Sequence, residues 1–98
     1  FFTRMASLDD GDGSLLDNSL IVVGGAHSDS NMHLSANVPT LVVGGAQNRL
    51  VSGRHIAYDD LPVSNLHLTV MDIAGIDPDE YLTETTDATG QLPGLTKA

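Results

Sequence analysis

The pattern of apolar and polar residues indicates two short strands. Residues 20–23 (LIVV) and 40–43 (TLVV) are almost wholly apolar, and each run ends at a pair of glycines. A strand that is apolar throughout, instead of alternating, is typical of a parallel sheet that is covered on both faces. Pro39 stands just before the second run, where its missing N–H costs least. The pattern therefore predicts two neighbouring, buried, parallel strands.

One amphipathic helix is predicted after these strands, over residues 65–74. Ser64 is suited to cap its beginning, and Gly75 is suited to follow its end. We expect the helix to pack on one face of the sheet. Its apolar face, at helical spacing, consists of Leu66, Val70, Ile73 and Ala74.

The remaining segments are rich in turn-forming residues. Residues 8–19 predict a surface loop with one helical turn at 14–17, and residues 47–60 predict a short hairpin or an irregular excursion. Residues 83–98 predict an extended tail without a core of its own. The order of strand, loop, strand, excursion and helix favours the α/β class, in a single domain or part of one over residues 1–98.

The net charge of the chain limits which classes of partner we expect it to bind. The chain has 13 acidic and 4 basic residues, and its formal net charge is −9. Such a chain repels the phosphates of nucleic acids and of anionic lipids, so we expect neither as a partner. No apolar run approaches the roughly 20 residues of a membrane-spanning helix. The sequence has no cysteine, which excludes disulfides and thiolate metal sites.

The loop after the first strand carries the best candidates for metal ligands. His27, Asp29 and His33 lie within seven residues, and imidazole and carboxylate groups bind zinc and other divalent metals well. Their spacing is not an established motif, and a further ligand would have to come from elsewhere. The alternative is a solvated loop whose Ser, Asp and Asn side chains satisfy their own backbone.

A weaker candidate is an anion site at Arg54 and His55. Both follow a Ser-Gly turn, and the guanidinium of an arginine can hold phosphate, sulfate or carboxylate with two hydrogen bonds. The alternative is a hairpin tip whose arginine offsets part of the negative charge. The sequence predicts no catalytic residue, because it has no cysteine, no G-x-S-x-G and no phosphate-binding loop.

Five stretches, taken in order, resemble the C-terminal region of the uncharacterised HXXSHH family of bacterial proteins. That region in turn is similar to the C-terminal part of the alkaline phosphatase superfamily, which includes sulfatases and cofactor-independent phosphoglycerate mutases. No single stretch is specific, and their order carries the resemblance. The stretches are GSLLDNS (13–19), SDSNMH (28–33), VPTLVVGG (38–45), SGRH (52–55) and NLHL (65–68).

The resemblance implies a fragment of an alkaline-phosphatase-like sheet. In active members of the superfamily the strand ends in adjacent Asp and His metal ligands. Here Ala26 stands at the Asp position, His27 matches the His, Asp29 is a displaced substitute, and His33 aligns with a later His ligand. The nucleophile and the remaining ligands belong to the N-terminal part of such proteins.

The resemblance also implies a function and partners. We expect no activity and no cofactor in the chain alone, and the missing N-terminal part of the same protein as its partner, with self-association as a secondary expectation. The intact parent is then either a metal-dependent hydrolase of phosphate or sulfate esters, with zinc or a similar metal, or a non-catalytic binding or structural module. The resemblance further suggests export from the cytoplasm.

Overall fold

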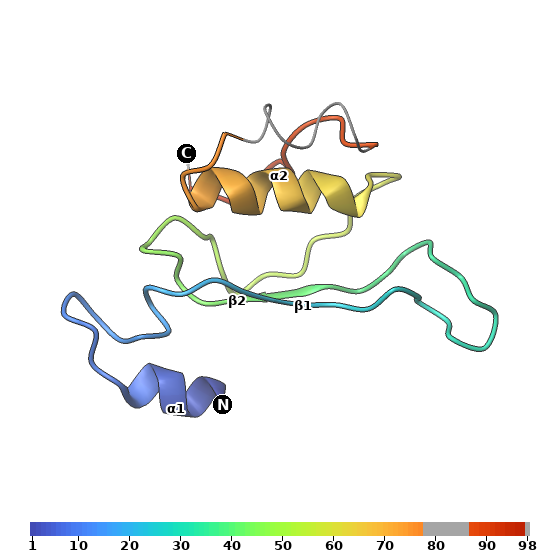
Figure 1. Ribbon diagram of the computed structural model, residues 1–98. Helices are drawn as coiled ribbons and strands as arrows, with labels where there is room; N and C mark the ends of the chain where they lie inside the picture. The colour runs from blue at the N-terminus through green and yellow to red at the C-terminus, as the bar shows by residue number, and fades with distance from the viewer. Residues whose placement is uncertain (78–86, 98) are drawn as a thin grey trace. The chain divides into compact units, whose positions relative to one another are not determined.

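The computed structural model describes residues 1–77 and 87–97 (Figure 1). The chain divides into two compact units, Phe1–Gln47 and Asn48–Ala98. The mixture of helices with a small sheet confirms the α/β class in its coarse form. Within the described residues no helix is long and apolar enough to cross a membrane. The elements are α1 (Phe2–Ser7), β1 (Ile21–Val23) and β2 (Leu41–Val43) in the first unit and α2 (Val63–Ile73) in the second.

The two strands are antiparallel, so the prediction of parallel strands is wrong. Ile21 lies opposite Val43 in a sheet of two strands. Parallel strands need a crossover of about a dozen residues or more, usually a helix. Residues 24–40 instead turn back on themselves, and an isolated antiparallel bridge between Asp29 and Leu34 joins the two halves of this connection. The result is one long hairpin (Figure 1).

The prediction that both strands are buried is also wrong. Val22, Val23 and Leu41 are 43%, 48% and 53% exposed. Side chains alternate between the faces of a strand, and every position of β1 and β2 is apolar, so both faces of the sheet are apolar. A sheet of two strands has too little surface of its own to cover them. The apolar runs therefore locate the strands but not their burial.

The base of the hairpin is held by a close approach of two backbone segments, residues 16–19 and 44–47, which we call the backbone clamp. A Cβ on Gly44 would lie 2.2 Å from the carbonyl oxygen of Ser19, and a Cβ on Gly45 would lie 2.3 Å from that of Asp17. Only glycine therefore fits at these positions. The N–H donors of the clamp and their carbonyl acceptors are Gly45 to Leu16 (3.0 Å), Ala46 to Ser19 (2.9 Å) and Gln47 to Asp17 (3.1 Å).

The sequence VVGGA occurs twice, at residues 22–26 and 42–46. The glycines of the first copy have no role comparable to that of Gly44 and Gly45. A Cβ on Gly24 would meet the Thr40 side chain at 3.5 Å, which is an ordinary contact, and a Cβ on Gly25 would meet nothing within 4 Å. The repeat therefore does not reflect one shared structural need. Only the second glycine pair admits a neighbouring backbone.

The turn predicted at residues 14–17 supplies two of the three acceptors of the clamp, the carbonyl groups of Leu16 and Asp17. The Ser14 N–H donates to Asp17 Oδ2 at 2.9 Å, and the Asp17 N–H donates to Ser14 Oγ at 3.1 Å. This reciprocal pair fixes the turn as a capping box fixes the first turn of a helix. Its carbonyl groups are thereby presented to residues 44–47.

The chain passes from the first unit to the second through a left-handed backbone. Ala46, Gln47 and Asn48 have φ angles of 49°, 55° and 69°. A non-glycine residue pays roughly 1–2 kcal/mol for this conformation. The clamp hydrogen bonds of Ala46 and Gln47 offset part of that cost.

Helix α2 ends as predicted but does not begin as predicted. Gly75 follows it with φ +80°, its N–H donates to the Asp72 carbonyl at 3.1 Å, and the Ile76 N–H donates to the Met71 carbonyl at 2.9 Å. This is the Schellman pattern that glycine favours. Ser64 is not the N-cap, because the helix begins after Pro62 and lacks a side-chain cap.

The buried face of α2 differs from the predicted apolar face. Leu66 and Leu68 are buried, but so are the polar side chains of Asn65 and Thr69, at 2% and 1% exposure. Val70 and Ile73 are only half-buried, and Ala74 is exposed. The helix was expected to pack on the sheet. The helix and the sheet belong to different units, so this expectation stays a prediction.

The segment predicted as a tail is bonded to the rest of its unit where the structure describes it. Leu50 and Thr96 form an antiparallel bridge, and residues 87–92 bond to α2. Residues 83–86 and 98 of the predicted tail lie outside the described residues. The excursion over residues 47–60 forms neither a helix nor a strand.

Candidate functional site

The tip of the hairpin is built by the side chain of Asp29. Its Oδ1 accepts hydrogen bonds from the N–H groups of Asn31, at 3.0 Å, and Met32, at 3.2 Å. The Ser28 N–H donates to the Leu34 carbonyl at 2.8 Å, and the Leu34 N–H donates to the Asp29 carbonyl at 3.1 Å. Asp29 therefore turns the chain, as aspartate commonly does in loops.

This turn brings two of the three predicted metal ligands together. The ring centroids of His27 and His33 lie 5.3 Å apart, and the rings meet edge to face at 82°. His33 has a φ of 55°, a left-handed conformation that reverses the chain just before Leu34. Both histidines are exposed.

The third predicted ligand has a different role. The Asp29 carboxylate holds its own turn, as the solvated-loop alternative supposed. Over residues 1–77 and 87–97, no group of three or more His, Cys, Asp or Glu side chains is placed to hold a metal ion. Among the described residues, the site therefore offers two neighbouring imidazoles.

The distance between the two rings can be compared with that of two imidazoles on one zinc ion. Zinc binds imidazole nitrogen at about 2.0–2.1 Å in tetrahedral geometry, so two rings on one zinc ion have centroids about 5 Å apart. The observed separation of 5.3 Å is close to this value. Structural zinc sites have four ligands and catalytic sites at least three protein ligands, so His27 and His33 do not complete either kind.

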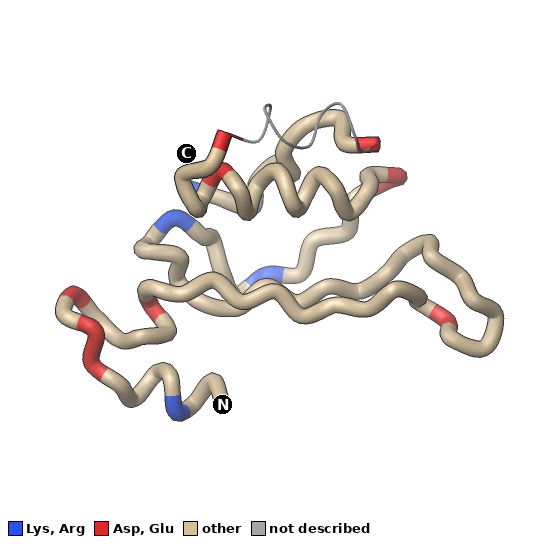
Figure 2. The backbone as a smooth tube through the Cα atoms, in the orientation of Figure 1, with Lys and Arg blue, Asp and Glu red and all other residues tan. Residues whose placement is uncertain are grey.

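The hairpin has little charge of its own. Asp29 is the only Asp, Glu, Lys or Arg between Asp17 and Arg49 in the sequence. Figure 2 shows the hairpin almost wholly in tan, the colour of residues other than Asp, Glu, Lys and Arg. The one formal charge among residues 18–48 is therefore negative, which favours a cation at the two histidines.

The predicted anion site has an arginine that is already engaged. Arg54 Nη2 donates to the Val51 carbonyl at 3.4 Å and also to the Gly94 carbonyl. An anion at Arg54 would have to compete with both carbonyl groups. His55 lies beside it at the exposed surface.

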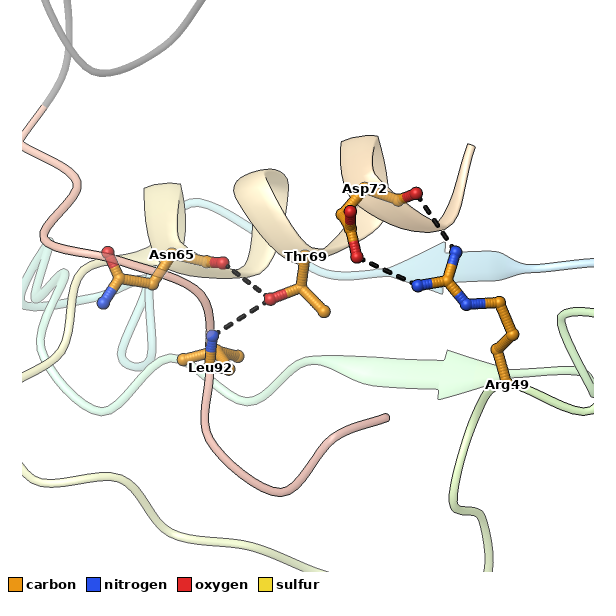
Figure 3. Close-up of polar contacts among 5 residues, drawn as sticks. All are labelled: Arg49, Asn65, Thr69, Asp72 and Leu92. Carbon is orange, nitrogen blue, oxygen red and sulfur yellow. Dashed lines mark hydrogen bonds and ion pairs between the residues drawn. The ribbon is translucent and has the colours of Figure 1, made fainter. Parts of the chain in front are cut away.

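A second constellation was missed by the sequence analysis. Thr69 Oγ1 donates to the Asn65 carbonyl and accepts from the Leu92 N–H, each at 3.0 Å (Figure 3). Nearby on the same helix, Asp72 accepts a hydrogen bond from Arg49 Nη2 at 2.9 Å. Asn65 and Thr69 are four residues apart and so lie on one face of α2. The available signal was this four-residue spacing of two polar residues, with Leu66 and Leu68 between them.

Comparisons with protein-family models, with curated proteins and with solved structures give no match to this chain. The resemblance to the HXXSHH family and to the alkaline phosphatase superfamily therefore stays a prediction from the residues.

Proposed function

We propose that this chain is a C-terminal part of an alkaline-phosphatase-superfamily-like protein of the HXXSHH type and has no catalytic activity alone. In this proposal the hairpin loop contributes His27 and His33 to a divalent metal site. The remaining ligands and the nucleophile belong to the N-terminal part of the same protein.

The contact between the two histidine rings carries this proposal. The ring centroids lie 5.3 Å apart, a separation that direct edge-to-face packing also gives. The separation suits two ligands of one metal, and the hairpin delivers both from one end of the sheet. The parent protein is then a hydrolase of phosphate or sulfate esters that uses a divalent metal.

Two observations favour a second candidate, a non-catalytic binding or structural module. Ala26 stands where the resemblance implies an aspartate ligand. Asp29, the nearest substitute, has its carboxylate bonded to its own turn. In this reading the fold is kept and the ligand set is lost.

A half-chelated metal tests whether the two histidines act together. Nickel nitrilotriacetate leaves adjacent coordination positions open and so needs a pair of close imidazoles. We expect the chain to bind this probe at least tenfold more tightly than His27→Ala or His33→Ala does. His67→Ala is the matched control, because His67 is an exposed histidine of α2, and it should bind like the unaltered chain. Equal affinity in all four proteins would refute the paired site.

Free zinc tests whether the ligand set is incomplete. We expect calorimetry at neutral pH to show binding weaker than the micromolar range, because two imidazoles leave a zinc ion short of protein ligands. Tighter binding that His33→Ala removes would show that the chain holds a full site.

Turnover tests the claim of inactivity, and the parent sequence separates the two candidates. The chain alone should not hydrolyse a generic aryl phosphate or sulfate, and hydrolysis that His33→Ala abolishes would contradict the proposal. A serine or threonine nucleophile beside an aspartate pair in the parent's upstream sequence would support the hydrolase. Its absence would support the non-catalytic module.

A further inference from the structure

The segment 87–97, which we call the strap, is held mainly by its backbone. Within the second unit, side chains and backbone groups of residues 49–69 bond to successive peptide groups of the strap. The contacts are Thr89 N–H to Asn65 Oδ1 (2.9 Å), Leu92 N–H to Thr69 Oγ1 (3.0 Å), Tyr58 O–H to Pro93 O (2.7 Å), Arg54 Nη2 to Gly94 O, Val51 N–H to Leu95 O (3.0 Å) and Lys97 N–H to Arg49 O (2.7 Å).

Lys97 Nζ also donates to Asn48 Oδ1, and two further contacts involve side chains near the beginning of the strap. Asn65 Nδ2 donates to the Thr89 hydroxyl at 3.0 Å, and the Ser64 hydroxyl donates to an Asp87 carboxylate oxygen at 2.7 Å. The Asn65 amide thus bonds to both the backbone and the side chain of Thr89. These contacts distinguish an Asp-x-Thr sequence from others.

The surface under the strap is buried and polar. Ser64, Asn65 and Thr69 are 8%, 2% and 1% exposed, and among the described residues no buried side-chain nitrogen or oxygen lacks a partner. Buried polar groups are costly unless they are hydrogen-bonded. These side chains of α2 are satisfied in part by the extended peptide that they bond to.

We propose that this surface, the strap site, is a peptide-binding site that the chain fills with its own strap. Its ligand class is an extended peptide with the pattern Asp-x-Thr. When the strap leaves, such a peptide from another molecule binds in its place. The site is formed by Tyr58, Ser64, Asn65 and Thr69, and it is independent of the two histidines.

The way the strap is held makes it displaceable. None of residues 87–97 is buried, and Leu92 and Leu95 are only half-buried. The strap is thus held by hydrogen bonds and not by a deeply inserted apolar anchor. A competing peptide with the same backbone groups can form the same bonds. Its attachment in the same chain gives the strap a high effective concentration, which keeps the site filled until the strap is weakened.

The test is a competition on the full chain. The probe is a fluorescein-labelled peptide with the sequence of residues 87–97, DATGQLPGLTK. The double variant Thr89→Pro, Leu92→Pro removes the two strap N–H groups that bond to α2 and leaves the strap site unaltered. We expect it to bind the probe at least tenfold more tightly than the unaltered chain does.

Two controls make the result specific. Adding Asn65→Ala to the double variant should weaken probe binding at least tenfold, because the Thr89 contacts are lost. A peptide with the same two proline substitutions should not compete with the probe. Equal probe binding by the double variant and by its Asn65→Ala derivative would overturn the proposal.

Circular dichroism would show whether the double variant folds. If it does not fold, hydrogen exchange of the unaltered chain tests whether the strap can leave its site. The amides of Thr89 and Leu92 should exchange together and at least tenfold faster than the amides in the middle of α2. That result means that the strap opens while the helix persists. Exchange of strap and helix at one common rate would show that the strap is a fixed part of the unit and would overturn the proposal.

Discussion

Replacing Gly45 with alanine should open the backbone clamp. A Cβ at this position would lie 2.3 Å from the Asp17 carbonyl oxygen and 3.0 Å from the Asp17 Cα. These are backbone atoms, so no flexible side chain can move aside. Residues 44–47 and 16–19 must separate to admit the methyl group.

The cost follows from the hydrogen bonds that the separation breaks. Three backbone bonds join the two segments, from Gly45, Ala46 and Gln47. With a net contribution of about 0.5–1.5 kcal/mol for each bond, their loss lowers the free energy of unfolding by about 1.5–4.5 kcal/mol. The left-handed residues that follow also lose the bonds that offset their strain.

Gly25→Ala is the matched control. Gly25 has the same neighbours in sequence, no positive φ, and nothing within 4 Å of an added Cβ. Alanine there restricts the unfolded chain and should raise stability by about 0.4–1 kcal/mol. The two variants differ in position only, so they isolate the clamp from the general effect of replacing glycine.

Urea denaturation and amide hydrogen exchange measure the difference. Gly45→Ala should lower the denaturation midpoint and speed exchange of the Ala46 and Gln47 amides, whereas Gly25→Ala should do neither. Equal midpoints and unchanged exchange in Gly45→Ala would show that the clamp is not formed in solution.

Two smaller effects are expected in the second unit. Gly75→Ala should destabilise α2 by about 1–2 kcal/mol, because alanine must then adopt a left-handed φ of about +80°, and thermal melting followed at 222 nm should show a smaller loss for Gly75→Asn. Arg49→Met should cost only about 0.2–1 kcal/mol, because the Arg49–Asp72 ion pair is 43% exposed on each side. That loss of stability should be smaller in about 1 M salt, where exposed charges are screened. A loss that does not depend on salt would instead assign the effect to the hydrogen bond between Arg49 and the Asp72 carbonyl.

The local features of the fold were predictable from the sequence, and the long-range ones were not. Both strands and the end of α2 at Gly75 follow from apolar runs and turn residues. The direction of the second strand depends on whether its connection crosses over or folds back. That outcome rests on the Asp29 turn. The sequence analysis considered Asp29 as a metal ligand or as part of a solvated loop, and not as a hairpin signal.

The candidate site was predicted to a similar extent. Spacing on one loop suggested His27, Asp29 and His33 as metal ligands. The structure places the two histidine rings in contact, and the metal site itself stays a prediction. The role of Asn65 and Thr69 was missed, because a polar residue in a helix is ordinarily assigned to its solvent face. Only the position of the distant strap makes that face an interior one.

The backbone clamp separates the architecture of the hairpin from the chemistry at its tip. Residues 16–19 and 44–47 fix where β1 begins and where β2 ends without using the side chains of residues 26–36, so changes at the tip that keep the Asp29 turn leave the clamp in place. Each doubling of a flexible loop costs only about 0.6 kcal/mol. The hairpin is therefore a natural graft point, where insertion of a longer loop or a different set of side chains alters what the tip binds while the strands below keep their register.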